Sequence, residues 1–313
     1  MKYIGIDVSK DKLDIFIRPD GRHFVVETDS ASLNKLAKEL QKLNPELVAM
    51  ESTGGYEKEL VKALVKSKLK VSVINPKLIK DFSRSGGARA KTDKLDSAVI
   101  AHYAEVHKPR EVVLASENEQ KLTDLVTRRR QLIDIKIAES NRLKQAKGII
   151  AEDITKHLEW LDKRVKEIDD ELNEQIQQSE ELKHNREIMI SIPGVGKVLS
   201  STLLLQLPEL GKFSGKKISA LAGLAPYNRD SGKLRGQMTI YGGRKEVRSA
   251  LYMPAWVAVK HNPVIKAFYE RLIAKGKKPK VAITACMHKL LLIINSLIKQ
   301  DIKWNPEYSK QNI

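Results

Sequence analysis

The chain has very little cysteine. Its 313 residues include a single one, Cys286. One cysteine cannot form an intrachain disulfide or a zinc site built from several thiolates, and such scarcity is typical of proteins that work in a reducing compartment. The apolar surroundings of Cys286 in the sequence favour an ordinary small core residue rather than a reactive thiol.

Long hydrophobic runs are also missing. The longest apolar run, residues 290–294, falls far short of the ~20 residues that a transmembrane helix needs, and the N-terminus has no signal-like apolar segment. Aromatic residues make up only 5% of the chain, whereas the hydrophobic content of 42% is ordinary for a globular protein. We therefore expect a soluble, cytoplasmic protein without a membrane partner, of a length that suits about two domains.

What the chain has in excess is positive charge. It carries 56 Lys and Arg against 39 Asp and Glu, a formal net charge of +17. Such a balance suits a polyanionic partner, and nucleic acid is the first candidate. Charge alone leaves two alternatives open, an anionic membrane surface and plain solubility.

The first hundred residues predict a mixed sheet with helices packed on it. Three apolar segments that are rich in β-branched residues come first, and helical and strand patterns alternate afterwards. The expected strands are residues 3–8, 13–17, 23–28, 47–50 and 71–74, and Asp29 or Ser30 can cap the first helix. The resulting order, β-β-β-α-β-α-β-α, argues against a doubly wound dinucleotide-binding fold, because that fold does not begin with a meander.

Four acidic residues lie within a predicted strand, at the end of another and at the start of a predicted helix. Asp7 lies inside the first apolar strand, where an ionised carboxylate is costly unless something pairs with it. Glu51 ends the fourth strand. After a basic loop at residues 83–91, Asp93 and Asp96 share one face of the first turn of a helix. The last pair has a simpler explanation, since acids at a helix N-terminus interact favourably with the helix dipole and Thr92 or Asp93 could be the cap.

Placed in the expected sheet, the four acids predict a metal site. An acid on the first strand, an acid ending the fourth and acids on a later helix are the ribonuclease-H-like layout, in which these carboxylates converge at one end of the sheet. A cluster of like charges is unstable without a cation, and oxygen-only ligands favour Mg²⁺, or Mn²⁺, over zinc. Two such ions can clamp the attacking and leaving oxygens of a phosphodiester displacement.

Residues 109–186 are long, charged and nearly free of Gly and Pro, which predicts helices with a break near Gly148. In the second half of this region a short heptad seam repeats at spacings of three and four, at Leu158, Leu161, Val165, Ile168 and Leu172. The seam suits a helical hairpin or a coiled coil with another subunit, and a helix packed on its own domain fits it as well. The run at residues 128–130 is a solvated charge run by default.

The second half of the chain carries two candidate phosphate-binding segments. The first, S-I-P-G-V-G-K at residues 191–197, matches a helix-hairpin-helix pattern, in which a glycine turn and a helix N-terminus approach phosphate, although it could be only a tight turn between helices. The second is the loop at residues 225–237, within which Ser231 is a candidate nucleophile or simply a turn residue. The candidate nucleic-acid contacts in the two segments and in the helix that follows are Gly194, Gly196, Lys197, Arg229, Lys233, Arg235, Arg244 and Lys245.

The motifs taken together resemble a known family. In order, they are G-I-D-V-S-K-D-K-L-D at residues 5–14, E-S-T-G-G-Y at 51–56, V-I-N-P at 73–76, K-T-D-K-L-D at 91–96, S-I-P-G-V-G at 191–196, G-L-A-P at 223–226 and D-S-G-K-L-R-G at 230–236. This ordered set resembles the DEDD transposases of IS110-type insertion sequences over nearly the whole chain. The family pairs a RuvC-like N-terminal domain with a C-terminal transposase domain across a helical linker.

The resemblance implies both architecture and chemistry. It implies an α/β plus α protein, with a RuvC-like domain at 1–108, a helical or coiled-coil linker at 109–186, a mainly helical transposase domain at 187–303 and a tail at 304–313. It implies metal ligands at Asp7, Glu51, Asp93 and Asp96, with Asp7 bridging metals, and a nucleophilic serine at Ser231. Because Ser231 is far from the acids in sequence, the two domains are expected to meet, within one chain or between subunits. Characterised members use a structured bridge RNA that pairs with donor and target DNA.

We therefore expect an insertion-sequence recombinase that exchanges DNA strands through a covalent serine–DNA intermediate, works as a homo-oligomer and uses a guide RNA. Three alternatives stay open. A metal-dependent Holliday-junction nuclease would use an activated water and leave Ser231 structural. An actin-like sugar kinase or ATPase also opens with an acidic hairpin, but it would need a later Gly-rich nucleotide loop and suits a charge of +17 poorly. A catalytically inactive nucleic-acid-binding protein would not need the full carboxylate set.

Overall fold

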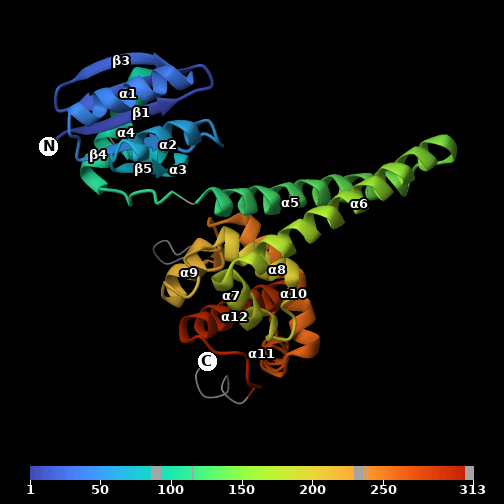
Figure 1. The fold of residues 1–313 in the computed structure, drawn as a ribbon. Helices are drawn as coiled ribbons and strands as arrows, with labels where there is room; N and C mark the ends of the chain where they lie inside the picture. Colours follow the sequence, from blue (N-terminus) through green and yellow to red (C-terminus); the bar gives the residue numbers. More distant parts are fainter. Residues whose placement is uncertain (86–92, 115, 229–235, 237, 307–313) are drawn as a thin grey trace. The chain divides into compact units, whose positions relative to one another are not determined.

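The computed structural model describes residues 1–85, 93–114, 116–228, 236 and 238–306, with the backbone alone described at residues 93 and 94. The chain forms two compact units, Met1–Ala115 and Ser116–Ile313 (Figure 1). The first unit is a sheet with helices on it, and in the described residues the second is almost wholly helical. The mixed α/β and mainly α character expected from the sequence is confirmed. The finer three-part division stays a prediction.

The first unit contains a five-stranded mixed sheet in the order β3-β2-β1-β4-β5. Strands β1, β2 and β3 form the expected antiparallel meander, while β4 and β5 run parallel to β1. The strands are β1 (Tyr3–Val8), β2 (Lys12–Arg18), β3 (Arg22–Glu27), β4 (Leu47–Glu51) and β5 (Val71–Ile74). The β1 strand therefore lies at the centre, with the meander on one side and the parallel strands on the other.

Helices cover both faces of this sheet. On one face, α1 (Ser30–Lys42) and α2 (Glu57–Lys66) pack their leucines against alternate β1 residues such as Ile4 and Ile6. On the other, α3 (Pro76–Ser85) and α4 (Asp93–His107) pack against Tyr3. Asp29 caps α1, since its carboxylate accepts hydrogen bonds from the amides of Ala31 and Ser32 at 3.0 Å each. The central strands β1 and β4 are therefore buried along nearly their whole length, as their near-continuous apolar runs indicate, whereas the edge strand β3 is partly exposed.

The sequence interpretation missed α3. Residues 83–85 were expected to open a basic loop, and they form instead the last turn of this helix. The helix has only 10 residues, and of its apolar residues Leu78, Ile79 and Phe82 only Ile79 is buried, so its periodic segment is short. The remaining residues of the expected loop, 86–92, lie outside the described chain.

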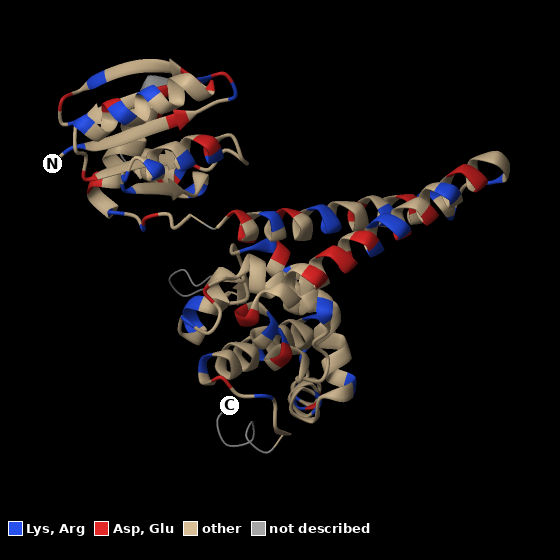
Figure 2. Cartoon of the chain, viewed as in Figure 1, with Lys and Arg blue, Asp and Glu red and all other residues tan. Residues whose placement is uncertain are grey.

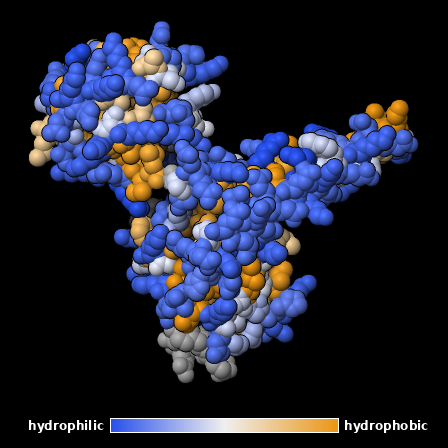
Figure 3. Space-filling model, in the orientation of Figure 1, coloured by the Kyte–Doolittle hydropathy of each residue, from blue (hydrophilic) through white to orange (hydrophobic). Residues whose placement is uncertain are grey.

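In the second unit, α5 (Glu117–Leu143) and α6 (Gly148–Gln178) form a helical hairpin. The heptad seam predicted on α6 is filled from within the chain, because its leucines and isoleucines pack against Leu122, Val126 and Leu132 of α5. The intramolecular hairpin, one of the open alternatives, is therefore what the structure contains. Figure 2 shows positively and negatively charged residues interspersed along both helices. At the tip of the hairpin Figure 3 shows hydrophobic surface, and there Ile149 is 79% and Ile150 59% exposed.

The rest of the second unit is a helical core that follows the hairpin. Its helices are α7 (Glu180–Ile190), α8 (Lys197–Gln206), α9 (Gly215–Leu221), α10 (Lys245–His261), α11 (Pro263–Ala274) and α12 (Pro279–Gln300), and a two-stranded ladder pairs β6 (Pro226–Tyr227) with β7 (Thr239–Ile240). By length and composition alone α12 could cross a membrane. Its apolar residues, among them Cys286, Leu290 and Ile294, are instead buried in the core of this unit.

Candidate active site

Two of the predicted acids lie at the carboxyl ends of neighbouring parallel strands. Strands β1 and β4 run parallel with Ile6 opposite Met50, so one more step of the same register sets Asp7 beside Glu51. Residues in register on neighbouring strands point to the same face. That face is the one on which Tyr3 packs under α3 and α4. This register is compatible with the expected convergence of Asp7 and Glu51, which stays a prediction.

Helix α4 runs antiparallel to β1 over the same face. A Cβ atom on Gly5 would lie 2.1 Å from the carbonyl oxygen of Ser97 and 2.4 Å from the amide nitrogen of Ala101, so the helix backbone rests directly on this glycine. Further along α4, Glu105 accepts a hydrogen bond at 2.8 Å from Arg18, the residue paired with Tyr3 at the start of β1. The N-terminal turn of α4 therefore lies toward the end of β1 that carries Asp7.

This direction accounts for the positions of the other two acids. Asp93 is the first residue of α4, and Asp96 directly precedes Ser97, the residue that rests on Gly5. Both belong to the turn nearest Asp7, where the N-terminal helix dipole favours negative charge. Among the described side chains no group of three acids, histidines or cysteines is arranged to hold a metal ion, and the side chain of Asp93 is not among those described. The four-acid metal site stays a prediction.

A fifth acid, which the sequence analysis did not assign, lies across from the first. Asp14 of β2 is paired with Asp7 of β1 and is only 5% exposed. Its carboxylate lies 3.0 Å from Nε2 of His23 and 3.3 Å from Nζ of Lys12. Two carboxylates on neighbouring strands repel each other, and the nearby ammonium group of Lys12 reduces that repulsion. The tight turn between β1 and β2 fixes which residues pair. The spacing of seven residues between Asp7 and Asp14 could therefore have indicated their pairing from the sequence.

The loop after Glu51 is held by another carboxylate. Glu57, at the start of α2, accepts hydrogen bonds from the amide and hydroxyl of Thr53 at 3.2 and 2.8 Å and from the amide of Gly55 at 2.8 Å. Burial by itself would raise the pKa of Glu57, but the hydrogen bonds from the backbone and from Thr53 outweigh it and lower the pKa. The ionised Glu57 carboxylate therefore holds the loop that follows Glu51 at the end of β4.

The predicted nucleophile lies outside the described residues. Ser231 and the neighbouring Arg229, Lys233 and Arg235 fall in the stretch 229–235. The two ends of this loop are tied together, because Tyr227 of β6 pairs with Thr239 of β7. Beyond the ladder, the guanidinium of Arg248 donates hydrogen bonds to the carbonyl oxygens of Gly223 and Gly242 at 3.3 and 2.6 Å. The loop that carries Ser231 thus starts and ends at a fixed stem.

The remaining predicted contacts lie in the second unit, around the turn between α7 and α8. Gly194 packs against α10, since a Cβ there would lie 2.7 Å from Ala258, whereas Gly196 has open space in front of it. Lys197 begins α8 and is exposed, and Lys245 at the start of α10 is exposed too.

Arg244 has a partner within the protein. Its guanidinium forms two hydrogen bonds with the carboxylate of Glu209, at 2.6 and 2.8 Å, so this side chain supports the fold of the second unit.

Comparison with known proteins identifies the family. A family model described as "Transposase", of the DEDD IS110 type, matches residues 4–146, and the model described as "Transposase IS116/IS110/IS902 family" matches residues 186–270. The "Pilin gene-inverting protein" of Moraxella bovis is 32% identical over 313 residues, covering 96% of each chain. The chain belongs to the IS110 family of transposases. Its enzyme class, a DNA transposase or recombinase, follows from that membership.

Two further similar proteins cover less of the chain. The "Insertion element IS900 uncharacterized 42 kDa protein" of Mycobacterium paratuberculosis is 28% identical over 38% of this chain and 31% of that protein. Among solved structures, Thermus thermophilus RuvC matches with a TM-score of 0.28 and 16% identity, over 36% of this chain and all of RuvC.

Proposed function

We propose that this transposase cuts and exchanges DNA strands at a divalent-metal site formed by Asp7, Glu51, Asp93 and Asp96. The observation that carries the proposal is the register that sets Asp7 beside Glu51, under the N-terminal turn of α4 that begins with Asp93. Carboxylate oxygens suit Mg²⁺ or Mn²⁺, and the crowding of like charges supports a cation there. Bound metal would supply Lewis acidity to a phosphodiester and stabilise charge on its oxygens.

The protein residues would orient the reacting phosphate. Asp7 lies on the strand between those that carry Glu51 and Asp14, so its carboxylate would be the central one among the residues that hold a metal. Glu57 would hold the loop after Glu51, and Gly5 would keep α4 close enough for Asp96 to reach the same edge. Each proposed metal ligand would thus be held by a rigid strand or helix.

The covalent step is assigned to Ser231. Its Oγ forms a bond to phosphorus while the bond from phosphorus to one DNA oxygen breaks, and the serine proton passes to a base or to water as the leaving oxygen takes up a proton. A free hydroxyl of the partner strand then attacks the phosphoserine, which restores Ser231 and forms a new phosphodiester. Phosphodiester bonds are conserved in number, so the exchange needs no energy source. Arg229 and Arg235 flank Ser231 in the sequence and would stabilise charge on the phosphate.

DNA is the proposed substrate, and a structured guide RNA is the proposed second nucleic acid. The net charge of +17 supports a polyanionic partner, and the name of the Moraxella protein supports inversion of a DNA segment as one outcome of the reaction. Lys197, Lys245 and the glycine turn before α8 are the proposed backbone contacts in the second unit. A homo-oligomer is proposed through the tip of the α5–α6 hairpin, where Ile149 and Ile150 are exposed.

A denaturing gel tests the covalent step. Purified protein is incubated with labelled DNA carrying the ends of its element, together with any RNA that copurifies with it. We expect the wild type to leave protein attached to DNA in the presence of Mg²⁺ and Ser231→Ala to leave none. Full strand exchange by Ser231→Ala, or cleaved DNA free of protein in the wild type, would point to hydrolysis by water instead.

The metal site is tested separately. Asp7→Asn keeps the size of the side chain and removes a charge, so we expect Mg²⁺-dependent cleavage to fall by at least about 100-fold, the scale of a lost electrostatic catalytic contact. Asp20→Asn, an exposed acid that is hydrogen-bonded to Lys2, makes the matched control. Equal activity of the Asp7 and Asp20 variants would refute the assignment.

A further inference from the structure

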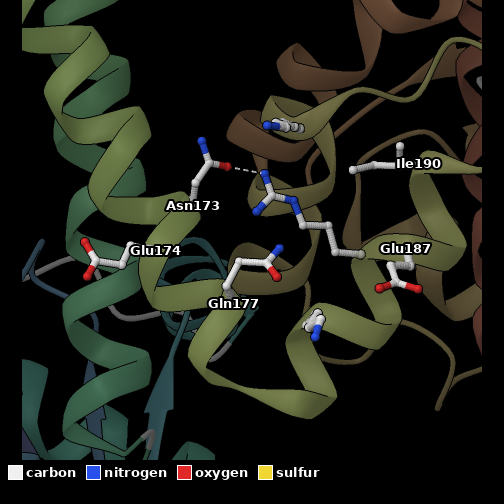
Figure 4. A pocket seen from close by; sticks show the side chains of 8 residues that line it. Asn173, Glu174, Gln177, Glu187 and Ile190 are labelled. Carbon is white, nitrogen blue, oxygen red and sulfur yellow. Dashed lines mark hydrogen bonds between the residues drawn. The ribbon is translucent and has the colours of Figure 1, made fainter.

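A pocket lined mainly by charged and amide residues lies in the helical unit. It has a volume of about 260 Å³ and is enclosed by the end of α6, by α7 and by the first residue of α8 (Figure 4). Helix α6 contributes Asn173, and the pocket also takes in three cationic side chains, Lys183, Arg186 and Lys197. At ~30 Å³ for each water of the liquid, the volume suits a phosphate group with part of its sugar.

Arg186 is the unusual member of this set, because it is buried. The residue is 3% exposed, and its guanidinium donates a hydrogen bond to the side-chain oxygen of Asn173, which the dashed line in Figure 4 marks. Its Nε is buried without a hydrogen-bond partner, and no carboxylate lies within ion-pair distance of the guanidinium among the residues that the structure describes. A buried guanidinium without an anion is costly, so an anionic ligand would stabilise it.

The nearest acids are engaged elsewhere. Asp169, whose charge opposes the lowering of the Arg186 pKa by burial, is bound to Arg129 at 2.6 and 3.0 Å. Glu187 lines the pocket but forms an ion pair with Lys303 at 3.2 Å. That leaves Glu174, which is exposed, as the one other acid in the lining. Three cations therefore face a single uncompensated carboxylate, and that carboxylate is screened by solvent.

The start of α8 adds donors to the same place. Lys197 is both the first residue of the helix and part of the pocket wall, and the preceding Gly196 supplies no side-chain cap. The space in front of Gly196 is open, whereas Gly194 of the same turn is fixed by its packing on Ala258. Packing within this chain thus explains one glycine of the motif and leaves the other free for the close approach of a ligand.

We propose that this pocket binds one phosphodiester group of a nucleic-acid backbone, with Arg186 as the fixed donor and Lys183 and Lys197 as its outer cations. The inference rests on the proposed action on DNA and adds where in the helical unit a strand is held. Asn173 orients the guanidinium, so that Arg186 acts as a rigid fork rather than as a mobile charge. Lysines alone would give only a diffuse attraction, so the buried arginine defines the register of the strand.

Binding of labelled nucleic acid to the full chain tests the proposal. The probes are a DNA duplex carrying the end of the element and an RNA hairpin of equal length, each titrated in EDTA over a range of salt concentrations. We expect Arg186→Met to weaken binding by about ten-fold and to lower the slope of log affinity against log salt by about 0.9 on duplex DNA, the value for one lost phosphate contact. Lys163→Gln, which removes an exposed cation of α6 outside the pocket, should leave the slope unchanged.

A further, double variant keeps the test decisive. Lys183→Gln with Lys197→Gln leaves the buried arginine in place, so a lower salt slope in this double variant supports the pocket even where Arg186→Met fails to fold. A loss in the DNA arm assigns the phosphate to DNA, and a loss in the RNA arm assigns it to a guide RNA. Unchanged affinity and slope in both arms, for a folded Arg186→Met and for the double variant, would overturn the inference. Because cleavage is not measured, failure of the Ser231 mechanism would leave this result intact.

Discussion

Gly5→Ala gives a direct test of how the first unit positions its acids. The added methyl group would lie 2.1 Å from the carbonyl oxygen of Ser97, where ordinary contact begins at 3.4 Å, so α4 would have to move by about 1.3 Å. Both close neighbours, Ser97 and Ala101, present backbone atoms that cannot rotate away. The expected loss of stability is therefore about 3 kcal/mol, the upper end for overpacked cores.

The same displacement should reduce activity more than stability. Asp96 is carried by the part of α4 that must move, while Asp7 stays on the strand. A misplacement of ~1 Å can lower a rate by about 100-fold, and we expect a loss of that size in Mg²⁺-dependent cleavage. Hydrogen exchange of the full chain measures the stability change, because the amides of α4 should lose protection while those of α12 in the second unit keep theirs.

Gly215→Ala is the matched control. There the added methyl group would meet only the end of a leucine side chain, Cδ2 of Leu292 at 2.7 Å, which can change rotamer. In the control, the hydrogen exchange of the α4 amides and the rate of cleavage should both stay close to those of the wild type. If Gly5→Ala behaved like Gly215→Ala in both measurements, the close contact of α4 with β1 would not be what positions the acids.

Three other predictions follow from the packing and the pKa shifts. Since hydrogen bonds lower the pKa of Glu57, its contribution to stability is present above the unfolded pKa and disappears as pH falls through the folded one. Glu57→Gln should therefore cost the first unit about 1–3 kcal/mol at neutral pH and nothing in acid, and a pH-independent difference in urea titrations would contradict this. Burial raises the pKa of Cys286 to about 11, so iodoacetamide near pH ~8 should modify it only after unfolding, and a mass shift in the folded chain would count against the burial. Leu161→Ala in the hairpin seam should lower stability by about 2–5 kcal/mol in a thermal melt without changing the mass by light scattering, whereas a change of mass would indicate that the seam joins subunits.

The sequence predicted the fold of the first unit well because its signals are local. Alternation of apolar residues, the turn after β1 and the cap at Asp29 each act within a few residues. The α3 helix was missed because it buries one residue, and its neighbours are exposed or half-buried. Whether the α6 seam faced another subunit could not be decided from spacing, because the partner, α5, is identified only once the chain turns back at the hairpin.

For the site, the sequence identified candidate residues but not the residues that lie next to them in the fold. Asp7 stood out as a charge in an apolar strand, whereas Asp14, which is more buried than Asp7, was not assigned a role because its pairing with Asp7 is visible only in the sheet. Arg186 gave no signal, since an arginine on a charged helix is ordinarily exposed. Its burial depends on the packing of three helices, which no local pattern encodes.

The stem beneath the Ser231 loop has a consequence for how this protein can change. Because β6 pairs with β7 and Arg248 binds both flanking glycines, the two ends of the loop stay together whatever lies between them. The entropy of closing a loop grows only with the logarithm of its length, so doubling the loop costs about 0.6 kcal/mol. Insertions between residues 228 and 238 that keep Ser231 and its neighbours should therefore cost the helical unit little stability.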